Sequence, residues 1–348
     1  MTEFGWGFIG ASIWARTRLI PAVTATTGAQ PIAVFSTSAE RGARFAQQCG
    51  LPRSYDSLDG LLADSEVNIV YISTTNDLHA RQAIAAAAAG KHVLCEKPLA
   101  TTVADAVQIQ AACDEAGVVL AINHHLRGAA TIVKLRQLIE TGAIGEVVAA
   151  RIFFASSLPD EMRTWRLDRP DAGGVALDLS VHSADTIRYL LADEIVEVTA
   201  LTSSGDLGQG IVEDSVMGVM RTSRGPLVCF HDSFTVPHAG NGIEIHGATG
   251  SLIARNVLSA DPVGDVWLRR LNDVTPIAIE HRWPLYENAV GRFMSAISDD
   301  GEVLTSAEDG IAALAIALAA LQSARQGRPV APEQPEPAND HGGRPSTG

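Results

Sequence analysis

The sequence has 348 residues, 46% of them hydrophobic, with 40 acidic and 26 basic side chains and a net charge of −14. Because a single hydrophobic core stops growing at about 250–300 residues, this length predicts two domains. The basic residues form no block in this acidic chain, so we expect no sequence-independent binding to nucleic acid or anionic membranes.

Cysteine usage and apolar runs limit the class of protein further. The four cysteines show no C-x-x-C spacing, which indicates a reducing compartment and argues against a zinc knuckle or disulfide scaffold. The longest apolar stretch, Ile311 to Leu321, is shorter than the roughly 20 residues of a membrane span, and the chain opens without a basic and apolar leader. We expect a cytoplasmic protein with no membrane span.

Residues 1–125 alternate short apolar runs with helical patterns. The helical segments 39–49, 78–89 and 103–116 are each followed by a glycine, the residue type that most often ends a helix. The runs that predict buried strands are Trp6–Ile9, Ile32–Ser36, Ile69–Ser73, His92–Cys95 and Val118–Ile122. This alternation predicts an α/β fold, with an N-terminal Rossmann domain whose doubly wound parallel sheet binds a dinucleotide at the C-terminal ends of its strands.

The pattern changes after about residue 145, and residues 126–326 predict an α+β domain with a mostly antiparallel sheet. Its expected strands are Val147–Ser156, Val196–Ser203, Val216–Thr222, Leu227–Phe234, Gly242–His246 and Ser251–Arg255. Its expected helices lie near Leu177–Leu191, Tyr286–Ile297 and Ala307–Ala324. We expect this domain to bind the substrate. One face of its sheet is a candidate oligomer interface, with monomer and homo-oligomer both open, and residues 327–348 are expected to form a disordered tail.

The first strand leads into a turn that resembles the phosphate-binding fingerprint G-x-G-x-x-G/A. It runs from Gly10 to Ala15 and has Ser12 where the second glycine usually stands. Ser12 must then be tolerated or donate its hydroxyl to a phosphate. A tight turn without a ligand would show the same residues, but the surrounding strand pattern favours a dinucleotide.

The end of the second strand predicts which nicotinamide cofactor binds. An NAD site usually has an acidic residue here, but the chain reads Phe35-Ser-Thr-Ser38, with no carboxylate before Glu40. Hydroxyls, helix N-terminal amides and the guanidinium of Arg41 suit a 2′-phosphate, so we expect NADP(H). Alternatively, Ser38 is only a helix cap and Arg41 only a solvated side chain.

Two further motifs carry candidate catalytic groups. Glu96-Lys97-Pro98 follows a predicted strand, at a position where a lysine can reach both a dinucleotide and a substrate carbonyl. Asp178 and His182 have the i, i+4 spacing that places two side chains on one helix face. Because a histidine titrates in the range useful for proton transfer, the three residues predict carbonyl reduction, although an Asp-x-x-x-His pair alone is more often an ion pair or a cap.

Several of these segments resemble the Gfo/Idh/MocA family of sugar oxidoreductases over nearly the whole chain to about residue 325. They are GFIGASIWA from Gly7, STTNDLH from Ser73, EKPL from Glu96 and the Gly-Gly run that leads to Asp178 and His182. Longer segments, among them HVLCEKPLA, NHHLR, WRLDRP and VEDSVMGV, resemble a subgroup that reduces a cyclic anhydro keto sugar with NADPH.

The resemblance implies a role for each matching residue. Lys97, Asp178 and His182 would form the catalytic group, and no metal is needed. The expected cofactor-binding residues are Gly10, Ala11, Ser12, Ile13 and Trp14 in the phosphate turn; Ser36, Thr37 and Arg41 at the 2′-phosphate; Thr74, Thr75, Asn76, Asp77, Leu78 and His79 beside the nicotinamide; Glu96 and Lys97 at the reaction centre; and Asn123, Trp165, Arg166 and Tyr286 near cofactor or substrate. Two departures, the bulky Ile13-Trp14 pair and one glycine fewer before Asp178, concern the shape of the pocket.

The expected reaction is hydride transfer from NADPH to the keto group of a cyclic sugar. The same residues would serve a dehydrogenase that oxidises a sugar, an inositol or a glycoside. A non-catalytic NADP(H) sensor is a third reading, which the retention of all three candidate catalytic residues disfavours. A metal site built from His124, His125, His182 and His231 lacks compact ligand spacing, and Ser180 and Ser183 lack the G-x-S-x-G elbow of hydrolases.

Overall fold

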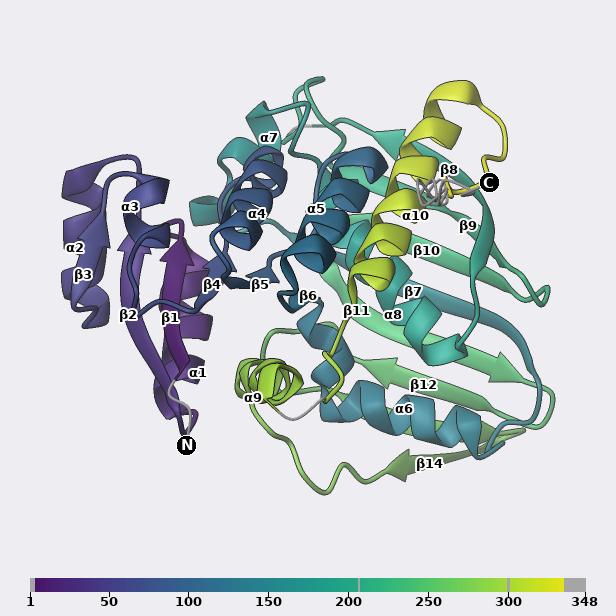
Figure 1. Cartoon of the computed structure of the whole chain (residues 1–348). Coiled ribbons are helices and arrows are strands. Elements are labelled where there is room, and N and C mark those ends of the chain that lie inside the picture. The colour runs from purple at the N-terminus through teal and green to yellow at the C-terminus, as the bar shows by residue number, and fades with distance from the viewer. Residues whose placement is uncertain (1–3, 206, 299–300, 335–348) are drawn as a thin grey trace, which may run out of the picture.

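The structure is a computed structural model of the chain that describes residues 4–205, 207–298 and 301–334. Its first half is a six-stranded parallel sheet with the order β3-β2-β1-β4-β5-β6 (Figure 1). The strands are β1 (Phe4–Ile9), β2 (Ala29–Phe35), β3 (Arg53–Tyr55), β4 (Ile69–Ile72), β5 (His92–Cys95) and β6 (Leu120–Ile122). The predicted doubly wound sheet is confirmed, and β3 is an edge strand that the sequence pattern missed.

Helices and helical turns connect these strands. They are η1 (Ala15–Leu19), α1 (Ile20–Ala25), α2 (Ala39–Cys49), α3 (Leu58–Leu62), η2 (Asn76–Leu78), α4 (His79–Ala88) and α5 (Val103–Ala116). Ser38 and Thr102 cap the N-termini of α2 and α5 by accepting backbone N–H groups. Gly50 and Gly117 end the same helices with φ of 68° and 64°, a conformation that glycine adopts without steric cost.

An eight-stranded sheet forms most of the second half, in the order β14-β13-β12-β11-β7-β10-β9-β8. Its strands are β7 (Val147–Ser157), β8 (Ile195–Ser203), β9 (Ser215–Thr222), β10 (Leu227–Ser233), β11 (Thr235–Gly247), β12 (Ser251–Arg255), β13 (Asp265–Arg270) and β14 (Asp273–Ile277). All neighbours are antiparallel except β7 and β10, which pair in parallel. The expected mostly antiparallel sheet is confirmed, with β13 and β14 as strands that were not predicted.

The remaining helical elements cover one face of this sheet or return to the first. They are η3 (His125–Gly128), α6 (Ala130–Glu140), η4 (Asp160–Met162), α7 (Trp165–Asp168), η5 (Ala176–Ser180), α8 (Val181–Leu191), α9 (Leu285–Ser298) and α10 (Ala307–Gln326). By length and composition α10 would suit a membrane span. However, it lies between α5 and the strands of the second sheet and is mostly buried, as a core helix would be (Figure 1).

Part of the segment expected to be a disordered tail is described. Val330 is 8% exposed and forms a β-bridge with Val198 of β8. Both backbone hydrogen bonds of this bridge are present, at 2.8 and 2.9 Å. The chain therefore continues to pack on the second sheet after α10 ends. Residues 335–348 of the expected tail lie outside the described residues.

Candidate active site

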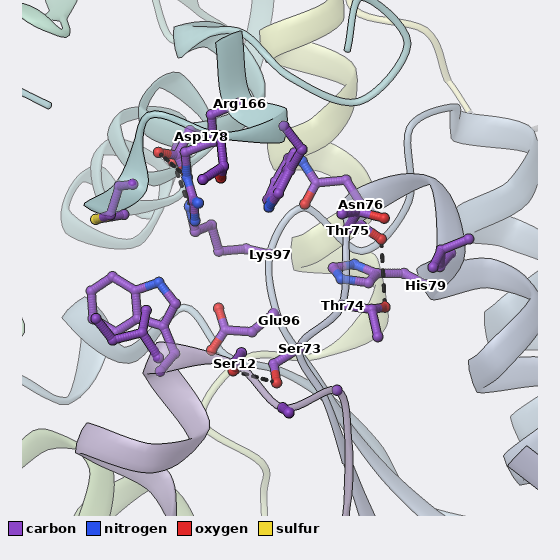
Figure 2. A pocket seen from close by; sticks show the side chains of 18 of the residues that line it. Ser12, Ser73, Thr74, Thr75, Asn76, His79, Glu96, Lys97, Arg166 and Asp178 are labelled. Atoms are coloured by element: carbon purple, nitrogen blue, oxygen red, sulfur yellow. Dashed lines mark hydrogen bonds and ion pairs between the residues drawn. The ribbon is translucent and has the colours of Figure 1, made fainter. Parts of the chain in front are cut away.

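A cavity of about 500 Å³ opens at the C-terminal edge of the parallel sheet. β1 pairs with β2 on one side and with β4 on the other, so the strand order reverses at β1. Ligands of doubly wound sheets bind in the crevice at such a reversal. Residues of the opening turn, of the loop after β4 and of the Glu96–Lys97 segment line this cavity, which we call the cofactor cleft (Figure 2).

The opening turn requires glycine at its first position. Gly10 has φ of +105°, and a Cβ added there would lie 3.2 Å from the backbone carbonyl of Ser73. Its N–H donates to the carbonyl of Phe35 at 3.1 Å. The Ser12 hydroxyl lies 2.8 Å from the Ser73 hydroxyl and accepts the N–H of Ala15 at 3.0 Å. Ser12 therefore caps the turn into η1, which explains how a serine replaces the usual second glycine.

The end of β2 presents a hydroxyl and a guanidinium together. Ser36 is 2% exposed, and the Arg41 Nε donates to its hydroxyl at 2.9 Å. Ser38 accepts the N–H of Arg41 at 3.3 Å, so its hydroxyl serves as the helix cap. Arg41 is exposed but lines the cofactor cleft, with its Nε beside the Ser36 hydroxyl. Glu40 is exposed and contacts only Arg44, at 3.9 Å, among the residues that the structure describes.

Side chains that follow β4 connect the two halves of the molecule. Asn76 donates from its amide to the carbonyl of Ala172 at 2.8 Å, and Asp77 pairs with Arg169 at 2.9 Å. Both partners lie in the loop that precedes η5. The buried His79 lies 2.9 Å from the Pro98 carbonyl and lines the cleft with its neighbours Thr74, Thr75 and Leu78. These contacts hold the loop before η5 against this side of the cofactor cleft.

Lys97 and Asp178 form the centre of the site, although they come from different halves of the chain. The Lys97 ammonium donates to the Asp178 carboxylate at 2.7 Å and to the Asp178 carbonyl at 2.6 Å (Figure 2). Arg166 donates to the other carboxylate oxygen at 3.2 Å. Burial opposes ionisation of Asp178, but the charges of Lys97 and Arg166 outweigh it and lower its pKa to about 2. Asp178 is thus an anion that fixes the lysine and leaves one ammonium N–H for a ligand.

Glu96 is held beside this pair by two donors. The Tyr71 hydroxyl and the Asn123 amide both donate to its Oε1, the latter at 2.6 Å. Burial raises the pKa of Glu96 even though both hydrogen bonds and the Lys97 charge favour the anion. Both side-chain donors therefore hold one carboxylate oxygen of Glu96 beside Lys97.

A second cavity of about 170 Å³ adjoins the cofactor cleft. Asp178 and His182 both line it, so the expected shared face of the Asp-x-x-x-His pair is confirmed, even though Asp178 lies in the wide helical turn η5 rather than in α8. Most of the remaining wall is apolar, with Leu126, Phe154, Leu158, Pro159, Phe234 and Leu258 among its residues. Trp14, Glu96, Lys97, Met162 and Asp178 line both cavities, which places the lysine at their junction.

The surroundings of His182 disfavour its charged form. Its ring packs edge-on against His124 and His125, with centroids 5.4 Å away in each case, and His125 stacks on Tyr286 at 4.9 Å. Burial and then the Lys97 charge lower the pKa of His182 well below its usual value. The imidazole is therefore neutral near pH 7. The three imidazoles and the Tyr286 ring contact one another through their faces and edges. No group of three or more His, Cys, Asp or Glu in the described ranges could hold a metal ion.

Two family models match the chain. The model for the "Oxidoreductase family, NAD-binding Rossmann fold" matches residues 4–124, and the "GFO/IDH/MocA C-terminal domain" matches residues 132–253. A 1,5-anhydro-D-fructose reductase from Ensifer adhaerens is 47% identical over 324 residues, which cover 93% of this chain and 97% of the relative. The chain belongs to the Gfo/Idh/MocA family of oxidoreductases.

More distant members share the same architecture. A myo-inositol 2-dehydrogenase from Thermotoga maritima is 27% identical over 311 residues, 87% of this chain and 91% of the relative. The crystal structure of an aldose-aldose oxidoreductase from Caulobacter crescentus, complexed with glycerol, superposes with a TM-score of 0.87 at 27% identity and covers 94% of this chain and 99% of that one. The NAD-binding Rossmann fold predicted from the sequence is thus confirmed.

Most of the expected site residues of this family member lie around the two cavities. Ser36 is buried, Thr37 is exposed, Asp77 pairs with Arg169, and Asn123 is buried against Glu96; none of the four lines either cavity in the described structure. Tyr286 lines the second cavity, and Trp165 lines the cofactor cleft with the Arg166 guanidinium 4.6 Å above its ring.

Sequence reasoning missed most of the wall of the second cavity. The loop from Leu258 to Ala260 contributes three lining residues, and the segment around Leu158 and Met162 contributes more. These residues lie outside regular strands, and they share no periodicity or motif with the catalytic segments. The apolar side chains are of the kind found in any core, so only the three-dimensional arrangement identifies them as pocket walls.

Proposed function

We propose that the protein catalyses the NADPH-dependent reduction of the keto group of a cyclic anhydro sugar, with 1,5-anhydro-D-fructose as substrate and 1,5-anhydro-D-mannitol as product. The observation that carries the proposal is the position of Lys97 at the junction of two cavities, with one ammonium N–H that no described residue accepts. The identity of 47% to a 1,5-anhydro-D-fructose reductase supports the choice of substrate.

The described residues fit a bound dinucleotide. The glycine turn at Gly10 lets the backbone approach closely at the start of η1, where a side chain would collide with Ser73. When bound, NADPH would supply the hydride that becomes the new C–H bond of the alcohol. We propose that residues 1–125 hold this cofactor and that residues 126–326 supply most of the sugar pocket, in a cytoplasmic enzyme. The free state of all four cysteines is consistent with that compartment.

The chain's own groups act on the ketone oxygen. Lys97 points its remaining N–H at this oxygen, polarises the carbonyl and gives up the proton that completes the alcohol. Asp178 and Arg166 fix the position of the ammonium, because both are paired and nearly buried. His182 is neutral and therefore exchanges a hydrogen bond with a substrate hydroxyl instead of supplying a charge.

The preference for NADPH follows from the end of β2. Ser36 and Arg41 present a hydroxyl and a guanidinium where an NAD site has a carboxylate. We expect Arg41→Ala to raise the KM for NADPH by about 10- to 100-fold, because a charge-assisted hydrogen bond to phosphate is lost. The KM for NADH should change little. Arg44→Ala is the matched control, since Arg44 is on the same helix and its side chain is 62% exposed. Equal effects of Arg41→Ala on both cofactors would contradict the assignment.

A dehydrogenase acting in the oxidative direction is the second candidate. The same lysine would then remove the alcohol proton, and a myo-inositol 2-dehydrogenase is among the relatives. A non-catalytic sensor is disfavoured, because it has no use for a buried Lys97–Asp178 pair that faces both cavities.

The deciding experiment follows nicotinamide absorbance with purified protein. NADPH and NADH are each tested with 1,5-anhydro-D-fructose and other keto sugars, and NADP⁺ is tested with myo-inositol and pyranose sugars. Turnover of 1,5-anhydro-D-fructose that is fastest with NADPH supports the proposal, provided that the product is identified as 1,5-anhydro-D-mannitol. Faster oxidation of an alcohol would assign the dehydrogenase, and tight NADPH binding without any turnover would assign the sensor.

A further inference from the structure

Trp14 occupies an unusual place between cofactor and sugar. It directly follows the phosphate turn and precedes η1, yet its half-buried side chain lines both the cofactor cleft and the second cavity. The neighbouring Ile13, with 37% exposure, lines only the cofactor cleft. A residue of the dinucleotide-binding turn thus contributes a large aromatic surface to the sugar pocket.

The loop after β12 lines the same cavity and is fixed to the helical turn that Trp14 begins. The N–H of Leu258 donates to the Asn241 side chain at 2.8 Å. Asp261 pairs with Arg18 of η1 at 2.6 Å. Because η1 both follows Trp14 and binds this loop, the indole and the loop are held in one arrangement without a ligand. Such preorganisation allows the wall to discriminate between ligands of different shape.

The junction of the two cavities combines charged and apolar side chains. Trp14 and Met162 line both cavities together with Glu96, Lys97 and Asp178. The rest of the second cavity mixes apolar side chains such as Leu158 and Phe234 with the polar residues His125, Ser156, His182, Ser259 and Tyr286. A sugar hydroxyl pressed against an apolar surface loses its water without gaining a partner, which is unfavourable. Beside Trp14 the pocket is therefore complementary to a ring edge without a hydroxyl.

We propose that Trp14 is a specificity-determining residue, whose indole packs against the hydroxyl-poor edge of the sugar ring and disfavours sugars that carry a hydroxyl there. This inference rests on the proposed function, because it concerns the sugar reduced at Lys97. It places a residue of the cofactor-binding turn among the residues that determine which sugar is reduced. The substrate class it selects is the cyclic ketone with a CH₂ group in the ring next to the carbonyl.

The test compares two ketones that differ by one hydroxyl. These are 1,5-anhydro-D-fructose and the pyranose form of D-arabino-hexos-2-ulose, which carries a hydroxyl where the first has CH₂. Wild type should prefer the anhydro sugar in kcat/KM. Trp14→Ala should reduce this preference by about tenfold, the scale on which an apolar pocket rejects an added hydroxyl, and Trp14→Phe should have a smaller effect. Ile13→Ala should leave the ratio unchanged.

A binding measurement separates sugar selection from effects on hydride transfer. The corresponding products, 1,5-anhydro-D-mannitol and D-mannose, are titrated calorimetrically against wild type and Trp14→Phe, which retains an aromatic core contact if the alanine variant fails to fold. The ratio of the two dissociation constants, which in wild type should favour the anhydro compound, should be closer to 1 in Trp14→Phe. An unchanged ratio in both assays, with the loss confined to the KM for NADPH, would overturn the inference. If wild type reduces neither ketone, the proposed function itself fails.

Discussion

Replacing Lys97 by methionine tests the central claim about the site. Methionine has a similar length but no charge and no proton, so the ketone oxygen loses both its polarising group and its proton donor. A positioned acid contributes about 10²- to 10⁴-fold to a rate, so kcat should fall by that factor, equivalent to roughly 3–5 kcal/mol in the activation free energy. The substitution also removes both hydrogen bonds from Lys97 to Asp178 and leaves Arg166 as its charged partner.

The assay for Lys97→Met is single-turnover oxidation of NADPH in the presence of the sugar, with cofactor affinity measured separately by fluorescence. Affinity for NADPH should stay within about threefold, because the groups proposed to bind the 2′-phosphate lie at the end of β2 and are unchanged. Lys134→Met on α6 is the matched control, since that ammonium contacts Gln137 at 3.3 Å and lines neither cavity. Turnover of Lys97→Met within threefold of wild type, in a folded protein that binds NADPH, would refute the catalytic role.

Two ion-paired aspartates outside the reaction centre give further predictions. Burial opposes ionisation of Asp309, but the hydrogen bond and charge of Arg127, with the charge of Arg188, lower its pKa to about 2 from 3.8. Because the pKa of Asp309 is lower in the folded state than in the unfolded state, this stabilisation is complete above pH 4 and is lost as the pH falls towards 2. Asp309→Asn should lower the free energy of unfolding, measured with urea at pH 7, by about 1–3 kcal/mol. The difference from wild type should become smaller below pH 4. The Arg18–Asp261 pair has side chains 34% and 56% exposed, so Asp261→Asn should change stability by less than about 1 kcal/mol. It should nevertheless raise the KM for the sugar by about two- to fivefold, which lies within that free energy, with the KM for NADPH unchanged, because the pocket loop is held less firmly. An unaltered sugar KM would contradict this.

The parallel sheet was largely predictable because its signals are local. Helices α2 and α5 have the predicted bounds, since Ser38 and Thr102 begin them and Gly50 and Gly117 end them. Whether a helix end is capped depends on residues three or four positions apart, so the sequence pattern is enough to predict where these helices begin and end. The short edge strand β3 was not predicted because none of its three residues is buried and they form no apolar run.

The second sheet was predictable in content but not in topology. Six of its strands showed an apolar pattern, whereas β14 is almost fully exposed and carries none. The parallel pairing of β7 with β10 joins residues that are far apart in the chain, such as Ile152 and Phe230. No local signal specifies which distant strands become neighbours, because that choice depends on packing of the whole sheet.

The candidate site likewise has residues that the sequence could identify and properties that it could not. Lys97, Asp178 and Arg166 could be named from their motifs, because charged residues in a defined spacing are rare and chemically distinctive. The neutral state of His182 could not, since it depends on burial beside Lys97, His124 and His125, which only the fold creates.

The proposed catalytic group is assembled from both halves of the molecule. Lys97 follows β5 of the parallel sheet, and its partner Asp178 lies in η5 beyond the first strand of the second sheet. The contacts from Asn76 to Ala172 and from Asp77 to Arg169 close the same boundary beside the cofactor cleft. Cofactor binding groups and the anion that positions the lysine are therefore coupled through one interface. We therefore expect that a loss of packing between the halves would impair the proposed catalysis more than dinucleotide binding by the first half.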